Sequence, residues 1–235
     1  SQRTIKNKIT CSGVGLHTGK KVKLTFHPAE PNTGILFRRI DGDKVVDIPA
    51  TAKNVGETTL STTLVYGDYK ISTIEHLLSA LAGTGVDNCI IDCDGPEIPI
   101  MDGSSTQFVF LIQTAGIVEQ NAVKKFVYVT KSVQVQRDDA VARIKPYDGF
   151  RVTFTLEFDH PVYNKYPHSA SIDFSQTSFI REVSRARTFG LMDDLEKLKK
   201  MNLALGANLN NAIGIGDEDV LNEGGLRFAD EFVKH

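Results

Sequence analysis

The first half of the chain alternates hydrophobic and polar residues over short segments, and hydrophobic residues at helical spacing interrupt this alternation twice. A period of two is typical of strands, and a spacing of three to four residues is typical of amphipathic helices. Polar and glycine-containing turns separate the segments. The pattern predicts strands over residues 20–28 and 33–40, a hairpin over 58–72, a helix over 72–85, a strand over 87–95 and a helix over 105–117.

The second half repeats this order of strands followed by helices. The polar segment 119–125 separates the two halves and predicts a domain boundary near residue 123, so that the domains span residues 1–123 and 124–235. We expect strands over 125–136, 140–146 and 150–161, a helical segment over 177–186 and a helix over 192–202.

Two local similarities between the halves indicate an internal duplication. The segment "VKLTFHP" ending at Pro28 is similar to "TLEFDHP" ending at Pro161, and "TIEH" ending at His76 is similar to "FVKH" ending at His235. Both pairs occur in the same order, as copies of one unit would. The predicted fold class is α+β, with two similar domains that each layer helices on a β-sheet and with the active site between them.

The predicted helix over 72–85 has one apolar face and one unusual face. Its apolar stripe should face a core and consists of Ile74, Leu77, Leu78 and Leu81. The opposite face combines one acid and one imidazole with small residues, namely Glu75, His76, Ser79, Ala80 and Gly83. Small residues allow close approach, so this face is expected to line a site between the two halves.

Two interpretations of Glu75 and His76 remain open from this segment alone. Ser72 and Glu75 match a capping box, in which the glutamate only accepts a backbone hydrogen bond, and His76 can be an ordinary structural histidine. An adjacent Glu–His pair also suits a zinc hydrolase, where the imidazole binds the metal and the carboxylate takes a proton from water. The metalloprotease pattern H-E-x-x-H does not match.

Composition and charge exclude several classes of function. A net charge of −2 without a long basic segment argues against nucleic acid or an anionic membrane as partner. No apolar segment approaches the roughly 20 residues of a transmembrane helix, and no signal peptide is evident. Three cysteines make no disulfide framework, so we expect a protein of the reducing cytoplasm. We also expect a monomer.

The segment "SGVGLHTGK" fails as a nucleotide-binding loop. Val14 and Lys21 break the Walker pattern, and Thr18 breaks the dinucleotide spacing. We expect a turn carrying His17, which is either structural or lines the site.

Taken together, five segments give the chain a specific resemblance to a known family. They are "TGKKVKLTFHPAEPNTGILFRRID", "STIEHLLSALAG", "GPEIPIMDGSS", "SRARTFG" and "LNEGGLRFADEFVKH". The chain resembles the zinc-dependent UDP-3-O-acyl-N-acetylglucosamine deacetylases of lipid A biosynthesis from about Gln2 to His235. The resemblance implies hydrolysis of the N-acetyl group of an acylated UDP-sugar, with release of acetate.

The resemblance also implies roles for individual residues. His76 and His235 are expected to bind Zn²⁺, with iron as the alternative metal, and Glu75 to act as the general base. Thr188 is expected to polarise the amide carbonyl or to stabilise the tetrahedral intermediate. Substrate contacts are implied for the acyl chain at Phe189, Leu191, Leu195, Ala204 and Gly206, and for the uridine end at Glu157 and Phe158.

The family pattern continues after its second histidine as H-K-x-L-D-A-x-G-D, where the aspartate is the third zinc ligand, and a catalytic histidine follows. Neither occurs in these 235 residues. We therefore expect a truncated copy that binds zinc weakly, lacks measurable deacetylation and exposes apolar surface in a less stable second half. The alternative is a non-catalytic module that binds the sugar nucleotide and the acyl chain.

Overall fold

The computed structural model describes residues 1–235, apart from the side chain at position 176. Its first half is built on a five-stranded sheet with the strand order β2-β3-β8-β4-β5. The strands are β2 (Ile9–Val14), β3 (Lys21–Pro28), β4 (Ile35–Asp41), β5 (Lys44–Pro49) and β8 (Cys89–Cys93). Neighbouring strands are antiparallel except β4 and β8, which are parallel. The last strand of the sheet in sequence thus lies at its centre.

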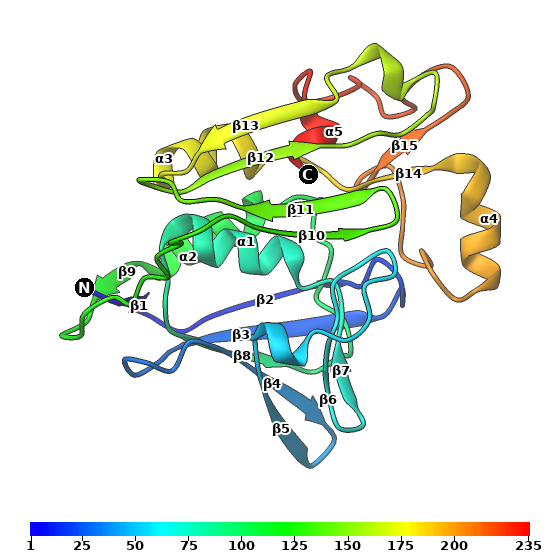
Figure 1. Ribbon diagram of the computed structural model, residues 1–235. Helices are drawn as coiled ribbons and strands as arrows, with labels where there is room; N and C mark the ends of the chain where they lie inside the picture. The colour runs from blue at the N-terminus through cyan, green and yellow to red at the C-terminus, as the bar shows by residue number, and fades with distance from the viewer.

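Two helices cover one face of this sheet. Helix α1 (Glu75–Thr84) packs against α2 (Thr106–Ala115), and both lie between the sheet and the hairpins of the second half (Figure 1). Helix α1 ends at Gly85, whose φ of +78° closes the helix in the left-handed conformation. The helices and the sheet together enclose the main core.

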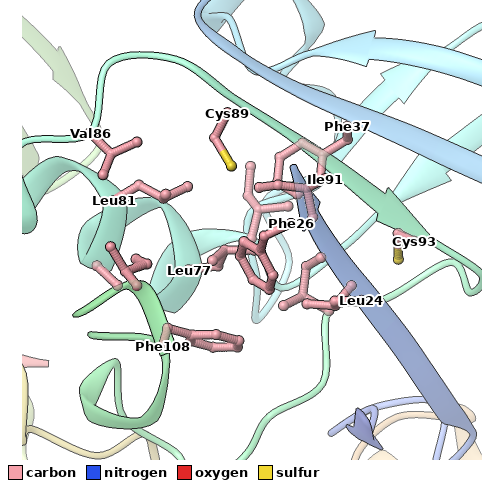
Figure 2. Packing of buried hydrophobic residues seen from close by; sticks show 14 of the residues in the cluster. Leu24, Phe26, Phe37, Leu77, Leu81, Val86, Cys89, Ile91, Cys93 and Phe108 are labelled. Carbon is pink, nitrogen blue, oxygen red and sulfur yellow. The ribbon is translucent and has the colours of Figure 1, made fainter. Parts of the chain in front are cut away.

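The main core combines alternate residues of the strands with the apolar stripes of the helices. Figure 2 shows Leu24 and Phe26 of β3 facing Leu77 of α1 and Phe108 of α2. All four side chains are fully buried or nearly so. Full burial of a side chain of this size stabilises the fold by about 1.5–3 kcal/mol, so this layer fixes where α1 and its first turn lie.

Three smaller elements complete the first half. Strand β1 (Arg3–Ile5) pairs with β9 (Ile117–Glu119), and β6 (Leu64–Tyr66) forms a hairpin with β7 (Tyr69–Ile71). A 3₁₀ turn, η1, spans Ala52–Asn54.

The second half contains separate two-stranded units rather than one wide sheet in the part of the chain that the structure describes. Its pairs are β10 (Val133–Arg137) with β11 (Ala140–Ile144), β12 (Arg151–Thr155) with β13 (Ser169–Asp173), and the parallel β14 (Phe189–Leu191) with β15 (Ile213–Ile215). Its helical segments are η2 (Tyr163–Lys165), α3 (Gln176–Ser178), the π-helical turn η3 (Phe179–Val183), α4 (Met192–Lys200) and α5 (Glu231–Lys234).

A second, smaller core lies under α5, and apolar side chains of the hairpins stay exposed. The small core is formed by Val162, Tyr163, Ile213, Ile215 and Phe232. Exposed apolar residues on β10, β11 and β12 are Val133, Val135, Val141, Ile144, Val152 and Phe154. The second half therefore exposes apolar side chains on its hairpins, while its lower stability stays a prediction.

The halves meet where α1 contacts η3. Ala80 of α1 is fully buried, and a Cβ atom placed on Gly83 would lie 2.1 Å from Cδ1 of Phe179 in the second half. The small-residue face of the helix therefore receives an aromatic ring from the second half, as the sequence pattern predicts for a face between two domains.

The α+β class is confirmed, while several predicted elements differ in extent. The strand predicted over 125–136 begins only at Val133, and the strand predicted over 150–161 ends at Thr155. After Thr155 the chain turns into η2, and the Tyr163 hydroxyl donates to the carbonyl of Leu156. The internal duplication stays a prediction. Among the described residues, no helix is both long and apolar enough to cross a bilayer.

Candidate metal and catalytic site

Two histidines that are far apart in the sequence contact each other where the two halves meet. His76 lies in the first turn of α1, and His235 follows α5. Their Nε2 atoms are 2.8 Å apart, although the residues are 159 positions apart in sequence. The rings cross at 72° with their centroids 5.1 Å apart. The geometry brings together the two predicted metal-binding side chains.

Both imidazoles are neutral at ordinary pH. Burial lowers the pKa of His76 to about 3, helped by the neighbouring His235 and opposed by Asp102. Burial likewise lowers the pKa of His235 to about 4, although Glu231 raises it. His235 is exposed as a whole residue, but its ring packs against His76 and Phe189. Neutral imidazole is the form that binds a metal ion.

The donor set fits part of a zinc site. Two imidazole Nε2 atoms converge on one point, and zinc in catalytic sites is typically bound by three protein ligands. Among the described residues, no cluster of three or more histidines, cysteines and carboxylates forms around a metal position. The arrangement therefore supplies two nitrogen ligands.

Glu75 is the first residue of α1 and does not form the predicted capping box. Its Oε2 accepts a hydrogen bond of 3.0 Å from the backbone N–H of Thr62, whereas the N–H of Ser72 donates to the carbonyl of Pro96. Burial raises the pKa of Glu75, while its own N–H, the N–H of Thr62 and the charge of His17 lower it. The half-buried carboxylate therefore does not form the capping box with Ser72, and it belongs to the residue that precedes His76 in sequence.

Helix α5 has only four residues, and a buried ion pair anchors it. Glu231 is 0% exposed and accepts hydrogen bonds from Nε of Arg187 at 2.8 Å, from a terminal guanidinium nitrogen of Arg187 at 3.1 Å and from the N–H of Arg227 at 2.6 Å. The N–H of Arg187 also donates to Glu231, at 3.1 Å. A helix this short is unstable alone, so these bonds and the buried ring of Phe232 position His235.

Thr188 and Phe189 follow Arg187 directly, and the ring of Phe189 contacts His235. The N–H of Thr188 donates to the carbonyl of Gly103 in the first half, and the N–H of Ile213 donates to the carbonyl of Thr188, both at 2.8 Å. The Phe189 ring lies edge-to-face on His235, with centroids 6.0 Å apart. Backbone contacts from both halves therefore fix the position of Thr188.

The predicted acyl-chain residues fall into two groups. Phe189 and Leu191 point from β14 toward the small core, and Leu195 is half-buried on α4. The N–H of Ala204 instead donates to Nδ1 of His17 at 3.3 Å, and the N–H of Gly206 donates to the carbonyl of Leu16 at 2.9 Å. The second group therefore docks on the turn that carries His17.

The two residues that were predicted to contact the uridine part of the substrate differ in their surroundings. Glu157 is exposed. Phe158 packs in the small core, with its ring 5.8 Å from that of Tyr163 and stacked on His160. Among the described contacts, neither Glu157 nor Phe158 touches His76 or His235.

The predicted site omitted several charged residues that organise it. Glu97 is buried beneath the His17 turn, and Asp102 binds Arg227 across the halves at 2.8 Å. Arg187 and Glu231 hold α5. Each lies within one of the five segments that carry the family resemblance, so charged residues inside those segments were the available signal.

The sequence is similar to known proteins over nearly its whole length. The family model for LpxC, UDP-3-O-acyl N-acetylglycosamine deacetylase, matches residues 2–235. A UDP-3-O-acyl-N-acetylglucosamine deacetylase from Methylococcus capsulatus is 59% identical over 234 residues, and one from Alcanivorax borkumensis is 58% identical over 234 residues. Each match covers 100% of this chain and 77% of the relative.

Proposed function

Because the chain belongs to the UDP-3-O-acyl N-acetylglycosamine deacetylase family of lipid A biosynthesis, we propose that it hydrolyses the N-acetyl group of UDP-3-O-acyl-N-acetylglucosamine. The observation that carries the proposal is the 2.8 Å separation of the Nε2 atoms of His76 and His235, with Glu75 adjoining His76 in sequence. We place the protein in the cytoplasm, as its few cysteines predict, and we propose that it is a monomer.

In this proposal His76 and His235 hold a zinc ion through their Nε2 atoms. Zinc supplies Lewis-acid chemistry when bound. The lowered pKa values keep both rings neutral above about pH 5. In the tautomer that carries its proton on Nδ1, a neutral ring offers Nε2 as a ligand. The edge of Phe189 restrains the ring of His235.

Glu75 and Thr188 carry out the proton and charge chemistry. The Glu75 carboxylate takes a proton from the water that attacks the amide carbonyl, and the hydroxyl of Thr188 donates a hydrogen bond to the carbonyl oxygen as it gains negative charge. The C–N bond then breaks, the nitrogen takes up a proton, and acetate and the free amine leave. Burial around Glu75 supports this role, because it makes the carboxylate a stronger base.

The substrate contacts follow the two groups of apolar residues. We assign the acyl chain to Phe189, Leu191 and Leu195 and to the loop containing Ala204 and Gly206. The uridine end is assigned to Glu157 and Phe158. The alternation of half-buried Phe189 and Leu191 with exposed Gly190 supports the first assignment, since both apolar side chains point to one side of β14.

The test is a direct assay of the free-amine product by mass spectrometry, with and without added zinc. The Methylococcus relative serves as the positive control. Zinc-dependent product would support the proposal and would contradict the absence of measurable deacetylation that the sequence predicts. In that case we expect His76→Ala to abolish both the product and the bound zinc. Conversion by the relative alone, with zinc bound to both proteins, would overturn the catalytic role.

The two-ligand donor set favours a second candidate function for these 235 residues. With two histidines as the described ligands, zinc should bind more weakly than at a three-ligand site. The polypeptide would then bind the acylated UDP-sugar without turnover. Calorimetric titration with zinc and with substrate distinguishes the two, because only the second function combines substrate binding with zinc occupancy far below one per chain.

A further inference from the structure

We propose that Glu97 is a positioning residue that holds the turn of residues 15–19 and the start of α1 in the arrangement that directs Glu75 and His76 into the site. This inference rests on the proposed function for its kinetic consequences. Glu97 lies in the loop after β8 and is 0% exposed. It therefore acts through its neighbours rather than on the substrate.

Three donors from two segments converge on the Glu97 carboxylate. Oε1 accepts from the N–H of His17 at 2.8 Å and from the hydroxyl of Thr73 at 3.2 Å. Oε2 accepts from the N–H of Thr18 at 2.8 Å. A buried carboxylate is costly unless hydrogen bonds compensate it, and these bonds do so by fixing both segments.

The hydrogen bond to Glu97 stabilises Thr73 in a strained backbone conformation. Its φ of +57° lies in the left-handed region, which is a genuine outlier for a β-branched residue. Thr73 is buried and precedes Glu75 by two residues, so its conformation sets the direction in which the chain enters α1. The bond to Glu97 offsets the strain where it matters for Glu75 and His76.

The turn of residues 15–19 closes around the same carboxylate. A Cβ atom on Gly15 would lie 2.3 Å from Oε2 of Glu97, so only glycine fits there without displacement. The carbonyls of Leu16 and His17 accept hydrogen bonds from Gly206 and Leu205 of the second half, at 2.9 and 3.1 Å. Glu97 therefore fixes both the start of α1 and the surface on which the second half docks.

An amide cannot replace this carboxylate. In Glu97→Gln, the side-chain NH₂ would face either the N–H of Thr18 or the two donors at Oε1, so at least one donor loses its acceptor. The variant keeps the shape of the side chain and isolates the effect of the lost bond.

The experiment compares Glu97→Gln and Thr73→Val with wild type in steady-state deacetylation and in amide hydrogen exchange. Thr73→Val keeps the β-branch and volume and removes only the hydroxyl, and Thr73→Ser is its matched control. Glu30→Gln changes an exposed glutamate of the same half. We expect both test variants to lower kcat by about 10- to 100-fold, the scale of a small misplacement of catalytic groups, with KM changed less than about threefold.

Hydrogen exchange separates this role from general destabilisation and from the proposed function. We expect faster exchange at the amides of His17, Thr18 and the first turn of α1, with unchanged exchange in β3 and β8. A kcat within about twofold of wild type in both variants would overturn the proposal. If the wild-type protein shows no deacetylation, the proposed function fails. Unchanged hydrogen exchange at the start of α1 in both variants would overturn the positioning role, whatever the activity. If Glu97→Gln does not fold, the comparison of kcat and hydrogen exchange between Thr73→Val and Thr73→Ser tests the proposal alone.

Discussion

At the scale of single residues, the neighbours Glu75 and His76 face different partners. Successive residues on an α-helix point about 100° apart, and here one side chain meets the N–H of Thr62 while the other meets His235. Under the proposed function, this separation would let one turn of helix provide both a metal ligand and a base. The carboxylate would then adjoin a ligand in sequence without being a ligand itself.

We expect Glu75→Gln to lower the turnover number by at least about 100-fold, the scale of general-base catalysis, while zinc content and fold stay unchanged. The amide keeps the acceptor for Thr62 but cannot take a proton. Steady-state assays with parallel zinc analysis check this. An unchanged turnover number would leave Glu75 with a purely structural role.

A second residue-scale prediction concerns the acyl chain. Leu191→Ala should raise the Michaelis constant more for long-acyl than for short-acyl substrates, because a buried contact of this size is worth about 1.5–3 kcal/mol. Leu191 also borders the small core, so the assay must run well below the melting temperature of the variant. Leu221→Ala, at an exposed position of the same half, is the control. Equal effects on both substrates would place the acyl chain elsewhere.

At the scale of elements, the sequence predicts helices and strands that bury one face, because burial of one face fixes the spacing of their apolar residues. The stripe of α1 and the alternation of β3 and β8 were predicted because one face of each packs in the main core. Strands β5 and β13 escaped prediction, since β5 is an edge strand with few buried residues and β13 has only Ile172 buried. Residues 126–129 form a continuous apolar segment with high strand propensity, yet they are not paired into a strand in the described structure.

The site was also predicted in part. The family resemblance implied that His76 and His235 bind one metal, and the structure brings their Nε2 atoms within 2.8 Å. The roles of Glu97 and Glu231 were beyond such reasoning. Each binds donors from segments distant in sequence, and no periodicity reports which backbone N–H groups will converge on a buried carboxylate.

The contact between α1 and η3 gives a prediction at this scale. Gly→Ala inside a helix normally stabilises by about 1 kcal/mol, but a Cβ on Gly83 would overlap the ring of Phe179. We expect Gly83→Ala to lower the free energy of unfolding by about 1–3 kcal/mol, the usual range for overpacking. Urea unfolding measures it.

The double variant Gly83→Ala with Phe179→Ala provides the control. Once the ring is removed, the added methyl group has room, so it should be neutral or stabilising relative to Phe179→Ala alone. Stabilisation by Gly83→Ala in the presence of Phe179 would show that the ring does not pack on the helix as described.

At the scale of the whole molecule, the halves are joined by polar contacts around the histidines. Arg227 of the second half binds Asp102 at 2.8 Å and Ser104 at 3.3 Å. Gly103 lies between them, and a Cβ there would approach the carbonyl of Asn211 to 2.3 Å. The site is therefore assembled only when the halves are docked, since each provides one histidine.

We expect Asp102→Asn to lower the free energy of unfolding by about 1 kcal/mol at pH 7, a modest value because the ion pair is partly exposed. Partial burial alone would raise the pKa of Asp102, but hydrogen bonds from Arg227 and Ser104 hold it below its ordinary value. A carboxyl with a lowered folded-state pKa stabilises above its ordinary pKa of about 3.9 and loses this contribution as pH falls through the lowered value.

The difference between wild type and Asp102→Asn should accordingly be constant from pH 7 to about 5 and shrink below about pH 4. Thermal unfolding across this range measures it, with Asp139→Asn at an exposed position as the control. A difference that grows on acidification would contradict the ion pair.

The central position of β8 also constrains the order in which the protein can mature on the ribosome. The hairpins β2–β3 and β4–β5 are complete by residue 49, but they join into one sheet only through β8, which begins at Cys89. Contacts of such sequence separation form slowly, because the intervening loop must first be closed. During synthesis the two hairpins therefore stay apart, and their apolar faces stay exposed. This lasts until residues 89–93 and the helices before and after them in sequence have emerged from the ribosome. Chaperone binding to nascent chains of increasing length should fall abruptly once α2 has left the exit tunnel.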